Sequence, residues 1–128
     1  MARGHYDRAL SIVRLVEGSS MEDQAEVSIN CAAVLLNLAA VDMAEGTFGS
    51  AVKRCTEAMA ADPSSHKALL RRAKANAARG EFDEADADLD HFEKLAGWGE
   101  GLDQERRWIQ AKRLAAKAAE RKVWAGAL

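Results

Sequence analysis

The chain repeats part of its own sequence at an offset of 34 residues. Seven identical pairs fall within a 17-residue window: Leu35 and Leu69, Leu36 and Leu70, Ala39 and Ala73, Ala44 and Ala78, Gly46 and Gly80, Phe48 and Phe82, and Ala51 and Ala85. A fixed period of this length is typical of folds that stack one supersecondary unit on the next. The repeat therefore predicts an array of similar units.

A shorter copy of the glycine-aromatic-alanine pattern occurs near the start of the chain, at Gly4, Tyr6 and Ala9. It leaves no room for a preceding helix, so we expect a truncated first repeat, with a half repeat and a loop over residues 3–25. The helix over about residues 6–16 would then carry an uncovered apolar face. Either another copy covers this face, or the chain is a fragment or an alternative start of a longer protein, which is the explanation we favour because solenoids usually need terminal caps.

Each complete unit has the pattern of a helical hairpin. Apolar residues recur at helical spacing from Val27 to Ala44, and Gly46 suits a left-handed helix end. The second helix should run from about residue 47 to 61 and end at Pro63, which cannot continue the hydrogen-bond ladder. Ser64 or Ser65 would cap the next helix, over about 66–79, and Gly80 would lead into the last one, over about 82–95. The second repeat is thus placed at 26–63 and the third at 64–97.

Composition supports one all-α domain over residues 1–128. The chain has 27 alanines but only seven aromatic residues and one proline, as closely packed helices require. Its net charge of −2 gives no overall attraction to nucleic acid or to an anionic membrane. The longest low-charge run, Val27 to Val41, is too short to span a bilayer, which predicts a soluble, cytoplasmic protein without a membrane partner.

No catalytic or metal-binding pattern is present, so we expect neither enzymatic activity nor a cofactor. The three histidines are scattered along the chain. Cys31 and Cys55 are not spaced like metal ligands, and neither has a histidine pair near it in the sequence. We expect both cysteines to be small buried hydrophobes. Three alternating aspartates, at 86, 88 and 90, are expected to form a solvated helix face.

A polar cluster points to binding instead. Lys67 and Arg71 are four residues apart and should lie one above the other on one helix. Asn37 precedes Arg71 by one period, so it should lie on the neighbouring helix and face the same concave side. Together these three side chains would supply donors and positive charge to a peptide carboxylate.

After the glycine-rich stretch that contains Trp98, a long helix should begin at Leu102 or Asp103 and cap the open end of the array over 102–128. We expect its packing face to carry Trp108, Ala111, Ala115 and Ala118. Its many basic residues are interpreted as a solvated outer face, balanced by Glu105 and Glu120.

These residues together resemble the tetratricopeptide repeat, a 34-residue helix-turn-helix unit. The likeness rests on the small residues Ala39 and Ala73, the glycine-x-aromatic turns, Ala51 and Ala58, and Pro63. The third unit departs from the family pattern, with Phe92 where a small residue is usual and Gly97 where proline is usual. The resemblance implies a helical-hairpin solenoid.

Asn37, Lys67 and Arg71 stand where the carboxylate-clamp class of this family holds the C-terminal aspartate of heat-shock chaperones. The ending Arg121-Lys122-Val123-Trp124 is similar to that of FKBP-type immunophilins. The resemblance implies a non-catalytic co-chaperone module that binds an acidic Glu-Glu-Val-Asp tail through a partial clamp, since a further Lys and Asn of the family's first helix are missing. Two alternatives remain: the targeting part of a peptidyl-prolyl isomerase whose catalytic domain is absent, or a scaffold that self-associates through its N-terminal helix.

Overall fold

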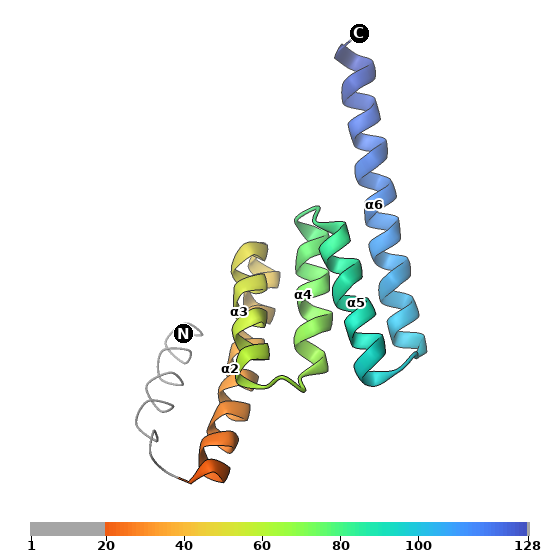
Figure 1. The fold of residues 1–128 in the computed structure, drawn as a ribbon. Helices are drawn as coiled ribbons and strands as arrows, with labels where there is room; N and C mark the ends of the chain where they lie inside the picture. Colours follow the sequence, from red (N-terminus) through yellow and green to blue (C-terminus); the bar gives the residue numbers. More distant parts are fainter. Residues whose placement is uncertain (1–19, 128) are drawn as a thin grey trace.

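The computed structural model describes residues 20–127, and this part of the chain is all-helical. The helices are α2 (Met21–Glu45), α3 (Phe48–Ala61), α4 (His66–Ala78), α5 (Phe82–Ala96) and α6 (Glu100–Ala127). α2 and α3 form one hairpin, and α4 and α5 form a second one beside it (Figure 1). The all-α prediction is confirmed for this range, whereas the half repeat expected over residues 3–25 lies almost wholly outside it.

Each hairpin turns at a glycine with a left-handed backbone, as the sequence predicts. Gly46 has φ 79° and Gly80 has φ 83°, a region that residues with a side chain rarely adopt. At the start of α4, the Ser65 hydroxyl accepts a hydrogen bond from the Ala68 amide. Asp62, just before the proline, ends α3 in an extended conformation. Local sequence signals therefore set the boundaries at these four residues to within about one residue.

The expected start of α2 at Val27 is wrong, because the helix begins six residues earlier, at Met21. The Ser20 side chain accepts a hydrogen bond from the Asp23 amide at 3.2 Å. Glu22 and Asp23 then place negative charge in the first turn, where the helix dipole favours it. This serine cap and acidic turn extend the helix into the stretch expected to be a loop.

α2 is also longer than the apolar run identified in the sequence. By length and composition alone, its 25 residues could cross a membrane, and the most apolar 18-residue window has a mean hydropathy of 1.7. A core helix meets the same criteria. In this structure Leu35, Leu36 and Ala39 of α2 are buried in the core, and 39% of the window is buried, so packing explains part of its hydropathy.

The core consists of two apolar clusters, one for each hairpin. The first joins α2, α3 and one side of α4, and it includes Leu35, Cys55 and Ala58. The second joins α4, α5 and α6 around Leu89 and Ile109. Seven alanines from four helices are completely buried, at positions 39, 51, 58, 68, 73, 75 and 85. Their small side chains allow close helix contacts, which explains the alanine-rich composition.

The expected packing face of α6 is wrong. Trp108 is 39% exposed and Ala111 is exposed, whereas Leu102 and Ile109 are buried against the second cluster. These two larger aliphatic side chains remove more apolar surface from water than alanines can. Beyond Arg113 the helix is exposed on all sides and projects past both hairpins (Figure 1).

Candidate functional site

The three residues predicted to bind a carboxylate lie on two helices that touch. Arg71 of α4 reaches across to α2, where its Nη1 donates a hydrogen bond to the Leu36 carbonyl oxygen at 2.6 Å. Asn37 is the next residue of α2 and is exposed. Lys67 lies one turn before Arg71 and is also exposed. The arginine thus lies at the α2–α4 contact, while the amide and the ammonium stay open to solvent.

The 34-residue spacing continues into α6. Leu102 and Ile109 follow Ala68 and Ala75 by one period, and all four are buried. Moreover, α4 contacts both α2 and α6. α6 therefore occupies the place of the first helix of a further unit, and its side facing α4 continues the surface that carries Arg71.

An ion pair at this continuation was missed by the sequence analysis. Lys74 Nζ of α4 lies 3.0 Å from Glu105 Oε1 of α6. Lys74 follows Arg71 by three residues, and Glu105 follows Arg71 by one full period. That second spacing is the signal that could have placed Glu105 on this surface. We call the surface formed by Asn37, Lys67, Arg71, Lys74 and Glu105 the first-helix face.

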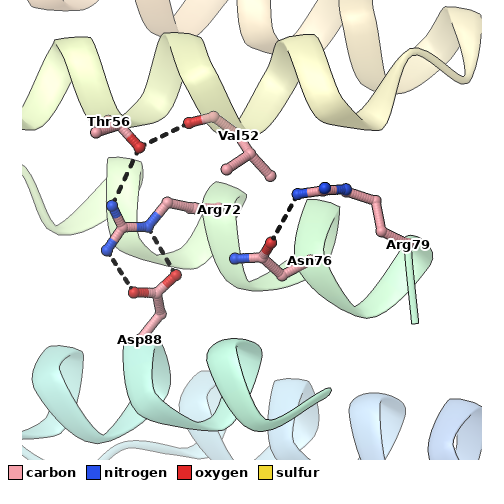
Figure 2. A network of polar contacts seen from close by, with 6 residues as sticks. All are labelled: Val52, Thr56, Arg72, Asn76, Arg79 and Asp88. Atoms are coloured by element: carbon pink, nitrogen blue, oxygen red, sulfur yellow. Dashed lines mark hydrogen bonds and ion pairs between the residues drawn. The ribbon is translucent and has the colours of Figure 1, made fainter. Parts of the chain in front are cut away.

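A polar network on a different side of α4 fixes the two hairpins together (Figure 2). Arg72 donates two hydrogen bonds to Asp88, from Nε at 2.9 Å and from Nη2 at 2.6 Å, and a third from Nη1 to the Thr56 hydroxyl at 3.2 Å. Thr56 in turn donates to the Val52 carbonyl oxygen. The hydrogen bond to Asp88 is the main reason that the pKa of Arg72 lies above its usual value. Residues of three helices line a recess of about 330 Å³ here.

The prediction that the three aspartates of α5 form a solvated face is wrong for Asp88, whereas the side chains of Asp86 and Asp90 are 46% and 65% exposed. Asp88 is only 6% exposed and pairs with Arg72. Asp86 pairs with Arg113 of α6, and Asp90 pairs with Arg106 of α6. Alternate residues of a helix point in different directions, so each aspartate meets a different neighbour.

The interpretation of the basic residues of α6 as a solvated outer face is correct for five of them, which are exposed, but not for Arg106 and Arg113. Arg106 bridges Asp90 and Glu93 of α5, and Arg113 bridges Asp83 and Asp86 of the same helix. Glu105 pairs with Lys74 of α4 rather than with the basic residues of its own helix. These contacts attach the first half of α6 to both helices of the second hairpin.

Both cysteines belong to the first apolar cluster of the core. Cys31 and Cys55 are both free and buried, as the sequence predicts. Burial raises the pKa of the Cys55 thiol to about 11, although the positive charges of Arg71 and Arg72 oppose the shift. A thiol with such a pKa is a poor nucleophile at neutral pH. Over residues 20–127, no group of three or more His, Cys, Asp and Glu side chains could hold a metal ion.

No family model matches the chain. The structure itself shows the two helical hairpins, and the first-helix face is their candidate functional site.

Proposed function

We propose that the chain is a non-catalytic binding module of the tetratricopeptide type that holds the C-terminal carboxylate of an acidic peptide between Asn37, Lys67 and Arg71. The observation that carries the proposal is the reach of Arg71 from α4 to the Leu36 carbonyl of α2. This contact holds a guanidinium beside the residue that precedes Asn37, with Lys67 one turn away on the same helix.

The chemistry of these groups suits a carboxylate. One Arg71 nitrogen donates to the Leu36 carbonyl, and a guanidinium has five N–H donors, so others remain for a ligand. Lys67 adds a compact positive charge, and the Asn37 amide can donate without adding charge. Hydrogen bonds between charged groups contribute about 1.5–3 kcal/mol each, enough for binding in the micromolar range from a few contacts.

The partner that this proposal favours is the acidic tail of a cytosolic heat-shock chaperone, which makes the chain co-chaperone-like and places it in the cytoplasm. This choice rests on the sequence resemblance to the carboxylate-clamp class. The chain itself would be no enzyme, whether or not it belongs to a longer peptidyl-prolyl isomerase.

Titration calorimetry with a Met-Glu-Glu-Val-Asp peptide tests the proposal. We expect a dissociation constant in the micromolar range or weaker, and a loss of about 10-fold or more in affinity when the peptide C-terminus is amidated. Lys67→Ala and Arg71→Gln should weaken binding to a similar extent. Lys94→Ala is the matched control, because Lys94 is an exposed lysine in the last turn of α5 and does not belong to the first-helix face.

Circular dichroism must show that each variant keeps its helix content, since Arg71 also contacts the α2 backbone. Equal affinity for the free-acid and the amidated peptide would overturn the proposal. Equal losses in Lys94→Ala and Lys67→Ala would do so as well, because they would indicate a general charge effect.

A further inference from the structure

We infer that Lys74 is a second carboxylate-binding residue of the same face and that Glu105 occupies it as an internal competitor, which an acidic side chain of the bound peptide replaces. The inference rests on the proposed function. It adds a binding residue and explains how the ligand's acidic side chains would be selected.

Three basic residues of α4 lie in one row. Lys67, Arg71 and Lys74 are spaced i, i+4 and i+7, so they form one row on a helix. Arg71 extends from this row to α2, and Lys74 extends to α6 on the opposite flank. Three cations of a single helix are therefore available to one extended ligand.

The ion pair between Lys74 and Glu105 is accessible to water. The Lys74 side chain is 44% exposed and that of Glu105 is 22% exposed, so water reaches both partners. By contrast, the Asp42 and Arg54 side chains are only 3% and 10% exposed. Partly exposed ion pairs contribute little net stability, so an external carboxylate can exchange with Glu105 at small cost.

The residue spacing of an extended peptide determines which of its side chains reaches Lys74. Side chains three residues apart on a helix lie about 5–6 Å from each other at their β-carbons. In an extended peptide, side chains on the same side recur every second residue, at about 6.6–6.8 Å. A peptide whose terminal carboxylate lies at Lys67 and Arg71 would therefore present to Lys74 the side chain of its third residue from the end.

The test combines Glu105→Gln with two free-acid peptides, Met-Glu-Glu-Val-Asp and Met-Glu-Gln-Val-Asp. The variant removes the competing charge, so we expect it to bind the first peptide about 3- to 5-fold more tightly than the unaltered chain does. Its affinity for the second peptide should be unchanged. Lys74→Ala should bind the two peptides equally well, which supplies a second and independent readout.

Glu120→Gln is the matched control, because Glu120 is exposed on the same helix, 15 residues further along. That separation is about 22 Å along a helix, well beyond the screening length at physiological salt. If Glu105→Gln binds no more tightly than Glu120→Gln, or tightens binding of both peptides equally, the inference is overturned and the proposed function stands. If neither the unaltered chain nor Glu105→Gln binds the free-acid peptides, both are overturned.

Discussion

The α2–α3 and α4–α5 hairpins share their turns and apolar contact positions, but they are joined internally by different ion pairs. In the first hairpin Asp42 of the first helix binds Arg54 of the second, with 2.6 Å between Oδ2 and Nε. One period later these positions hold Asn76 and Asp88. The second hairpin instead takes its arginine from the first helix, at Arg72, so the polarity of the pair is reversed.

The two pairs also differ in burial. The side chains of Arg54 and Asp42 are 10% and 3% exposed, whereas those of Arg72 and Asp88 are 21% and 8% exposed. Arg72 has a second partner in Thr56 of the neighbouring hairpin. Through this contact the second pair also ties one hairpin to the next. Identical apolar positions therefore leave the polar connections free to diverge.

Removing the acidic residue of each ion pair should give the largest difference in stability between the two hairpins. Asp42→Ala removes the carboxylate that pairs with the buried Arg54 side chain, and we expect a loss of about 3–5 kcal/mol in the free energy of unfolding. Asp88→Ala should cost less, about 1.5–3 kcal/mol, since the Arg72 and Asp88 side chains are more exposed. Urea denaturation followed by circular dichroism measures both losses. Equal losses would contradict the burial difference.

Replacing the turn glycine should destabilise the two hairpins to a similar extent, because both turns contain a glycine with a left-handed backbone. Gly46→Ala and Gly80→Ala each force an alanine into a left-handed conformation, at φ near 80°. No neighbouring atom lies within 4 Å of the added carbon at either site, so the cost is conformational alone, about 1–2 kcal/mol. Thermal unfolding of the two variants should show similar shifts. A much larger shift for one glycine would mean that the turns are not equivalent.

Cys55 offers a smaller effect that depends on pH. Burial raises the pKa of this thiol from 9.0 to about 11, and the charges of Arg72, Asp88 and Asp42 from the two ion pairs also act on it. The folded state therefore keeps the proton at pH values where the unfolded state loses it. Stability from this group is complete below pH 9 and is lost progressively between pH 9 and 11.

We expect the stability advantage of the unaltered chain over Cys55→Ala to shrink by about 1 kcal/mol between pH 8 and pH 10. Urea denaturation at the two pH values measures it, and the difference between the chains cancels the titration of other groups. Cys31→Ala should show a smaller change, because Cys31 is 5% exposed and Cys55 is 0% exposed. A constant advantage of the unaltered chain across this range would contradict the environment assigned to Cys55.

Much of the fold within residues 20–127 follows from local signals. Ser65, Gly46, Gly80 and the proline at 63 act on the backbone of their own turns, so their effects do not depend on distant parts of the chain. The boundaries of α3, α4 and α5 were predicted to within about a residue for this reason. The start of α2 was missed although Ser20 is also a local signal, because the apolar periodicity begins only at Val27.

The candidate site was predicted only in part. Asn37, Lys67 and Arg71 were predicted because the repeat relates their positions, and their binding role stays a prediction. The structure places the Arg71 guanidinium at the Leu36 carbonyl of α2, next to Asn37 in the chain. Lys74 and Glu105 were not found, because their pairing depends on how α6 rotates against α4. The one-period spacing from Arg71 could have placed Glu105 on this face, but no sequence signal indicates that it pairs with Lys74.

The amino-acid sequence by itself determined where the helices of the two hairpins turn and that small side chains separate them, because turn geometry and helical spacing are properties of short segments. Only the tertiary structure decided which charges meet. Asp88 is buried with Arg72, and α6 packs through Leu102 and Ile109 instead of Trp108. Each of these outcomes depends on the distance and rotation between whole helices, which are set when all of their faces pack at once.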